Sequence, residues 1–79
     1  ADYTAIAKAA MVTEPKVRLV LARREYKRLP KDLLKLAHLP YLELDLRGND
    51  HLDFEQAIDL LRQLPGLRLL ILTRNVVKT

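Results

Sequence analysis

The chain has 79 residues and a mass of 9.1 kDa, with 49% apolar residues, 30% charged residues and a formal net charge of +4. A chain of this length forms one small domain at most, and this composition is typical of a folded, soluble domain. The absence of cysteine and serine excludes catalysis by a thiolate or a serine hydroxyl, and it excludes disulfides and thiolate zinc sites. We therefore expect a domain that is not an enzyme and holds no cofactor.

Neither a membrane span nor a signal peptide is expected. The longest nearly apolar stretch, Leu67 to Leu72, is interrupted by Arg68 and is far too short to cross a bilayer. The first residue is alanine and no signal-peptide pattern follows it, so we expect a processed chain or a piece of a longer one.

At the N-terminus, the helical spacing of apolar residues predicts an amphipathic helix that ends before Glu14 and Pro15. Asp2 is placed to cap this helix, which we expect to cover one end of the domain over residues 1–14. Its predicted inward face consists of Tyr3, Ile6, Ala7, Ala10 and Met11.

Three prolines, Pro15, Pro40 and Pro65, divide the rest of the chain into units of 25 residues. A short apolar segment follows each proline, and the first two segments alternate with the period of a strand that has one buried face. The last segment is apolar on both faces. These segments predict strands at Val17–Leu21, Leu42–Leu46 and Leu67–Leu72, in units that span residues 15–39, 40–64 and 65–79.

Helical patterns lie between the predicted strands. Pro30 begins a short helix over residues 30–38, and Asp53 caps a longer one, with Gln56 reaching back as in a capping box. Because connections of this length join parallel strands, we expect three parallel neighbours in one sheet. The predicted inward face of the longer helix consists of Phe54, Ala57, Ile58, Leu61 and Leu64.

The third unit contains Leu67-Arg-Leu-Leu70-Ile-Leu72-Thr-Arg-Asn75. This segment resembles the leucine-rich-repeat family, whose consensus is Leu-x-x-Leu-x-Leu-x-x-Asn. Residues 67–75 match this pattern, and Leu44-Asp-Leu46-Arg-Gly-Asn49 matches its second half. The two asparagines of the chain, Asn49 and Asn75, both fall at the asparagine position of the repeat. The resemblance implies a short α/β solenoid with an N-terminal capping helix, three parallel strands and helical arcs on the convex side, and it implies a binding scaffold without naming a ligand.

Two departures from the repeat pattern have structural consequences. Arg24 stands where the first unit would carry asparagine, so that unit is degenerate. The third unit is one residue longer between its proline and its asparagine, which predicts a bulge near residues 68–70. We expect the Asn49 side chain to bond backbone groups of the adjoining turns, because its amide both donates and accepts.

The strand residues that point away from the leucines predict a binding surface for another protein, with Tyr41 as an aromatic anchor. An ordinary solvated sheet face is an equally good interpretation of the same alternation. The candidate partner-binding residues are Arg18, Tyr41, Glu43, Asp45, Arg47, Leu69 and Ile71.

Basic residues gather in the first half of the chain, where residues 1–38 carry nine basic and four acidic side chains. Residues 39–79 carry five basic and six acidic ones. The densest stretch is an alternative site for a nucleic acid or another polyanion, with Tyr26 stacking on a base. A solvated loop that leads into a helix, with Glu25 neutralising part of the charge, is the favoured interpretation of this stretch. The candidate residues are Arg23, Arg24, Lys27, Arg28 and Lys31.

No catalytic or metal site is predicted. His51 lies near Asp50 and Asp53, but their spacing fits a strand-to-helix loop with Asp53 as helix cap. Glu43 and Asp45 share one strand face, yet a flat sheet of three strands offers no pocket for acid–base chemistry.

Self-association through the third strand is the remaining expectation. Leu67–Leu72 carries no proline or inward charge to protect its edge, and no helix follows it in this sequence. We expect a two-fold homodimer with antiparallel third strands and a six-stranded sheet, centred on residues 69–72. The competing interpretation is that further repeats of a longer chain cover this strand.

Overall fold

The computed structural model describes residues 2–72, with side chains from Thr4 onward. Three strands alternate with helices in the predicted order, and the short second helix has 3-10 geometry. Asn75 and the side chain of Tyr3 lie outside the described part. The elements are α1 (Asp2–Ala10), β1 (Lys16–Val20), η1 (Lys31–Leu36), β2 (Tyr41–Asp45), α2 (Phe54–Leu61) and β3 (Leu67–Ile71).

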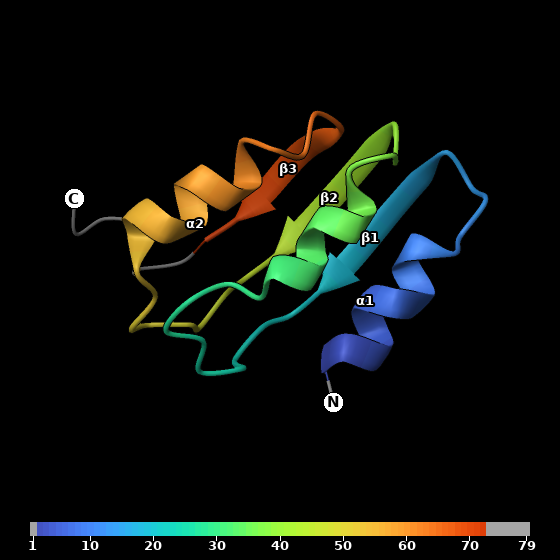
Figure 1. Ribbon diagram of the computed structural model, residues 1–79. Helices are drawn as coiled ribbons and strands as arrows, with labels where there is room; N and C mark the ends of the chain where they lie inside the picture. Colours follow the sequence, from blue (N-terminus) through green and yellow to red (C-terminus); the bar gives the residue numbers. More distant parts are fainter. Residues whose placement is uncertain (1, 73–79) are drawn as a thin grey trace.

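The strands form one open, parallel sheet in the order β1-β2-β3 (Figure 1). Leu19 lies opposite Leu44, and Leu44 lies opposite Leu70, so equivalent residues of the three units stand in one row. The pairing of β2 with β3 shifts by one residue, because Leu42 lies opposite Leu67 whereas Glu43 lies opposite Leu69. Arg68 is therefore the extra residue of a bulge, as the longer third unit predicted.

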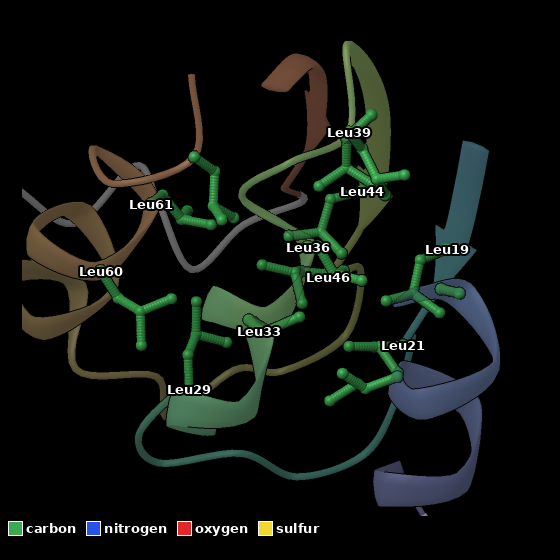
Figure 2. Close-up of a cluster of buried hydrophobic side chains, with 14 of the residues drawn as sticks. Leu19, Leu21, Leu29, Leu33, Leu36, Leu39, Leu44, Leu46, Leu60 and Leu61 are labelled. Atoms are coloured by element: carbon green, nitrogen blue, oxygen red, sulfur yellow. The ribbon is translucent and has the colours of Figure 1, made fainter. Parts of the chain in front are cut away.

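The core lies between the sheet and the helices, which all stand on one side of it (Figures 1 and 2). Alternation along β2 buries Leu42, Leu44 and Leu46 almost completely. The helical segments contribute further leucines to the same cluster: Leu29, Leu33, Leu36, Leu39, Leu60, Leu61 and Leu64.

Burial falls from the first two units to the third. The inward residues of β1 and β2 are at most 7% exposed, whereas Leu67, Leu70 and Leu72 are only partly buried. β1 and β2 are each followed by another strand in the sheet, whereas no strand follows β3 among the described residues. The lower burial of the third unit coincides with this end of the sheet.

Two predicted inward faces are wrong in detail. Met11 is 82% exposed, because α1 ends at Ala10 and the helical periodicity no longer applies beyond it. Ala7 is also exposed, and Ile6 and Ala9 are the buried residues of α1. In α2 the buried side is rotated toward η1, so that Leu60 replaces Phe54 and Ile58, which are only partly buried.

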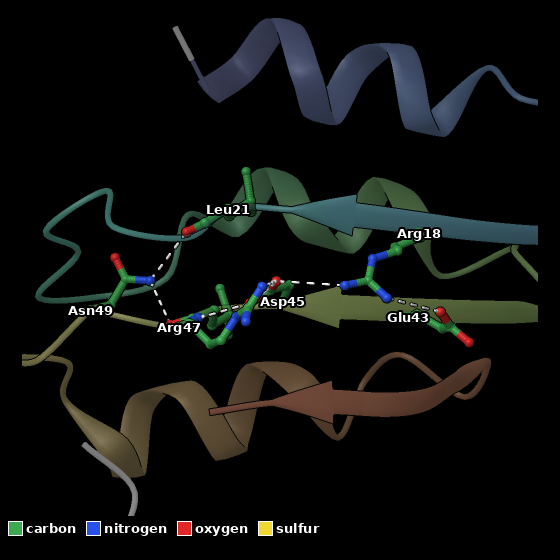
Figure 3. Close-up of polar contacts among 7 residues, drawn as sticks. Arg18, Leu21, Glu43, Asp45, Arg47 and Asn49 are labelled. Atoms are coloured by element: carbon green, nitrogen blue, oxygen red, sulfur yellow. Dashed lines mark hydrogen bonds and ion pairs between the residues drawn. The ribbon is translucent and has the colours of Figure 1, made fainter. Parts of the chain in front are cut away.

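Asn49 joins the first two units as predicted (Figure 3). The side chain is fully buried and its Nδ2 donates to the carbonyls of Leu21, at 3.1 Å, and Leu46, at 2.8 Å. Its Oδ1 accepts from the backbone N–H groups of Arg24, at 3.0 Å, and Tyr26, at 3.2 Å. One amide thus pairs four backbone groups that have left the β ladder.

The helix cap at Asp53 is confirmed, but Gln56 has a different role from the one predicted. Asp53 Oδ1 accepts from the Gln56 N–H at 3.1 Å. The Gln56 side chain turns to the first unit, where Oε1 accepts from the Leu29 N–H at 2.8 Å and Nε2 donates to the Leu29 carbonyl at 3.1 Å. The backbone N–H of Asp53 donates to the Lys27 carbonyl instead.

The substitution Leu44→Ala should lower the free energy of unfolding by about 2–5 kcal/mol, because it leaves a cavity at a fully buried position. Urea unfolding followed by circular dichroism measures the change. Met11→Ala is the control, since Met11 is exposed, and it should leave the midpoint almost unchanged. An unchanged midpoint for Leu44→Ala would contradict the assigned register.

The substitution Asn49→Ala should cost about 1–3 kcal/mol, because it leaves buried backbone groups without partners. Asp50→Ala is the matched control at the exposed neighbouring position. The same unfolding measurement compares the two variants. Equal stabilities would mean that the Asn49 amide does not hold the two units together.

Candidate functional site

The strands present a continuous surface on the side away from the helices, which we call the open face. The register sets Arg18, Glu43 and Leu69 in one row and Val20, Asp45 and Ile71 in the next. The structure thus brings together all seven candidate partner-binding residues, with Tyr41 as the first residue of β2 and Arg47 two residues beyond its last. It also adds Lys16 and Val20, both from β1.

Asp45 is the buried centre of the open face (Figure 3). Its side chain is fully buried and accepts from Arg47, with 3.0 Å from Nε to Oδ1 and 2.8 Å from Nη2 to Oδ2. The Arg47 backbone N–H donates to the same Oδ1 at 3.1 Å. The hydrogen bond from the Arg47 side chain lowers the pKa of Asp45, although burial opposes it, and the charge of Arg18 acts in the same direction as Arg47.

Glu43 forms ion pairs with the other two cations of the open face, Lys16 and Arg18. Its carboxylate lies 3.4 Å from Lys16 Nζ and 3.7 Å from Arg18 Nη1, and it accepts from the Tyr41 hydroxyl at 3.3 Å. Arg18 also approaches Asp45, at 3.7 Å, and Lys16 Nζ stands 4.9 Å from the centre of the Tyr41 ring. The charged side chains therefore form one network across β1 and β2.

Within this network the cationic side chains are much more exposed than the carboxylates. The side chains of Lys16, Arg18 and Arg47 are 63%, 49% and 50% exposed, whereas those of Glu43 and Asp45 are 13% and 0% exposed. The carboxylates lie beneath the cations that they hold. A partner that approaches the open face therefore meets positive charge first.

Apolar side chains flank the network on both sides. Val20 on β1 is 46% exposed and Leu69 on β3 is 41% exposed, and Ile71 beside Leu69 is partly exposed. Leu69 and Ile71 point away from the core, whereas Leu67, Leu70 and Leu72 pack against it, as the alternation predicted. The open face thus combines exposed cations with exposed aliphatic groups.

The five candidate side chains of the basic segment, residues 23–35, are exposed. Lys31 is the first residue of η1, and the other four lie on the loop between β1 and η1. Its course is fixed at both ends: the Arg23 N–H donates to the Arg47 carbonyl at 2.7 Å, and the Lys27 carbonyl accepts from Asp53. Arg23 and Glu25 adopt positive φ angles of 55° and 60°. Tyr26 is partly buried and packs against the core.

Carboxylates oppose one end of the basic segment. Arg28 Nη1 lies 3.3 Å from Asp53 Oδ2. Arg28 and Lys31 line one wall of a groove of about 570 Å³, and the other wall carries Asp53, Glu55 and Asp59 from the α2 side. Arg23, Arg24 and Lys27 are the candidate residues outside this groove.

The sequence places Val20 on the open face without marking it as a binding residue, and it leaves out Lys16. The signal was present, because residues 16, 18 and 20 alternate with the buried Val17 and Leu19 and must share one face. The inequality of exposure between cations and carboxylates has no counterpart in the sequence, since it depends on how the side chains fold over one another.

Among residues 2–72, no group of three or more histidine, aspartate or glutamate side chains is placed to hold a metal ion. None of the described helices has the length and apolar character that crossing a membrane requires. Comparison with protein-family models, curated proteins and solved structures finds no match to this chain.

Acid should weaken the fold partly through Asp45. Because its pKa is lowered in the folded state, its contribution to the free energy of unfolding is complete above about pH 4, the ordinary range of aspartate. The contribution is lost as the pH falls through the lower folded-state pKa. Unfolding in urea at a series of pH values should show Asp45→Asn less stable than the parent near neutrality, with the difference shrinking below about pH 4. A difference that stays constant over this range would contradict the assignment.

Proposed function

We propose that this chain is a leucine-rich-repeat module that binds an acidic segment of another protein on its open face, without catalysis. The observation that carries the proposal is the unequal exposure of charge on that face. Three cations are about half exposed, and the two carboxylates that pair with them are nearly or fully buried.

Three features support the repeat assignment. The units recur every 25 residues, equivalent leucines stand in register across parallel strands, and the amide at the repeat's asparagine position bonds four backbone groups of adjoining turns. Such an arrangement leaves one face of the sheet free of helices, and that face is where strand side chains are available to a ligand.

The chemistry of the open face favours a polypeptide over a simple polyanion. Leu69 and Ile71 add an apolar strip beside the cations, and Val20 adds a second one on β1. A segment with acidic side chains between aliphatic or aromatic ones would satisfy both kinds of group. Tyr41 is held by Glu43 and Lys16, so it offers a ring whose position is already fixed.

Binding of nucleic acid by the basic segment is the second candidate. The exposure of Arg23, Arg24 and Lys27 favours it, whereas the carboxylates opposite Arg28 and Lys31 weaken it. The two candidates use different surfaces, so substitutions separate them.

A display library of random linear peptides should yield ligands rich in aspartate, glutamate and large apolar residues. Arg18→Gln and Leu69→Ser should each weaken binding of a selected peptide about tenfold, because each removes one of the two kinds of contact. Lys27→Gln is the matched control and should leave the affinity unchanged. Isothermal titration calorimetry on folded variants measures these effects.

The opposite pattern would overturn the proposal. It consists of tight binding to an oligothymidylate that falls steeply with added salt and is lost in Lys27→Gln but kept in Leu69→Ser. That result would assign the function to the basic segment.

A further inference from the structure

The two ends of the stack of units differ in what covers them. At the β1 end, α1 packs on η1 and β1 and buries Ile6 and Ala9. It stands in line with η1 and α2, in the place where the helix of a preceding unit would lie (Figure 1). At the other end, β3 pairs with β2 alone within the described residues.

Among residues 2–72, this second end is apolar on both β3 and α2. Leu67, Leu70 and Leu72 remain partly exposed, although their counterparts in β1 and β2 are buried. Phe54 and Ile58 are also partly exposed, on the side of α2 that does not face η1. They line a shallow hollow of about 340 Å³ together with Glu55, Asp59 and Arg62. We call this combined surface the β3 end.

The backbone of β3 is oriented to accept another strand. The Ile71 carbonyl accepts from the Leu46 N–H at 2.9 Å, so Ile71 directs its backbone groups toward β2. Backbone groups alternate along a strand, and those of Leu70 consequently face the outer edge. The nearest charge is Arg68, which lies at the bulge and is exposed.

We propose that the β3 end binds a second copy of this chain across a two-fold axis perpendicular to the sheet. The strands then run antiparallel, Leu70 of one copy pairs with Leu70 of the other, and one sheet of six strands results. The same axis brings the two α2 helices together on the helix side of the sheet. Phe54 and Ile58 then pack against their counterparts.

Head-to-tail association is the other way for identical chains to cover this end, and α1 opposes it. A second copy stacked on the β1 end would set the apolar flank of α2 against the outer side of α1, which exposes Thr4, Ala7 and Lys8. A two-fold arrangement avoids placing an apolar surface against a polar one, because each copy contributes the same apolar surface to the interface. It also closes the assembly at two copies.

Charge is partly complementary in the two-fold arrangement, because each copy brings Arg62 as well as Glu55 and Asp59 to this hollow. Antiparallel α2 helices that meet at Ile58 place Arg62 of one copy beside Phe54 and Glu55 of the other. Each interface therefore gains two pairs of opposite charge at its rim, around an apolar centre. The open face remains on the opposite side of the sheet, so dimer formation does not require the peptide ligand.

Sedimentation equilibrium of the 79-residue chain tests the proposal directly. We expect a concentration-dependent mass that approaches twice 9.1 kDa in the high-micromolar range. Ile58→Lys should raise the dissociation constant at least about tenfold, because it buries an unpaired charge at the axis. Met11→Lys makes the same change at an exposed position near α1 and should have no effect.

A covalent trap tests the strand pairing. The chain has no cysteine, so Leu70→Cys introduces a single thiol, and paired residues across the axis would lie about 5.5 Å apart at Cα, within disulfide range. We expect a disulfide-linked dimer in mild oxidant, and none from Met11→Cys. A parent chain that stays monomeric at high-micromolar concentration overturns the proposal and leaves another repeat unit as the partner of this end. A dimer that Ile58→Lys does not weaken and that Leu70→Cys does not cross-link overturns the proposal as well.

Discussion

The structure depends on satisfying the backbone where each chain segment leaves the sheet. Parallel strands of neighbouring units end at the same edge, and their exits would bury polar groups together. Asn49 pairs with two carbonyls and two N–H groups there, and it does so from a fully buried position. The loops that follow can then turn toward the helix side, where Gln56 makes a similar pair of bonds to the Leu29 backbone.

The open face displays positive charge although it carries nearly equal numbers of cations and carboxylates, three and two, because the carboxylates are buried. Asp45 is a structural carboxylate: Arg47 and Arg18 neutralise it and it contacts no solvent. Each of these arginines keeps about half of its side-chain surface exposed. An acidic ligand would replace water around cations whose positions are already set by buried partners, which lowers the entropic cost of binding.

Much of this arrangement follows from the amino-acid sequence. The period-2 alternation of Val17–Leu21 and Leu42–Leu46 predicted the strand faces, and the extra residue in the third unit predicted the bulge at Arg68. Each of these features is set by local pattern and chain length.

Other features arise only when the units pack. The rotation of α2 toward η1 depends on the space between two helices, and the helical spacing permitted either Ile58 or Leu60 inside. Gln56 found a partner 27 residues away, which no local capping pattern encodes. Gly66 is likewise explained by packing, since a Cβ there would stand 1.9 Å from the Leu39 carbonyl oxygen.

The decline of burial toward β3 has a consequence for local unfolding. Among residues 2–72, β3 has partly exposed leucines and pairs with β2 alone, so within a single copy we expect it to open at a smaller free-energy cost than β2, which has a strand on both sides. In a single copy, amide hydrogens of β3 should therefore exchange with solvent through partial openings, whereas those of β2 should exchange only on global unfolding. We expect the cooperativity of unfolding to be graded, with the region near α1 more stable than the third strand.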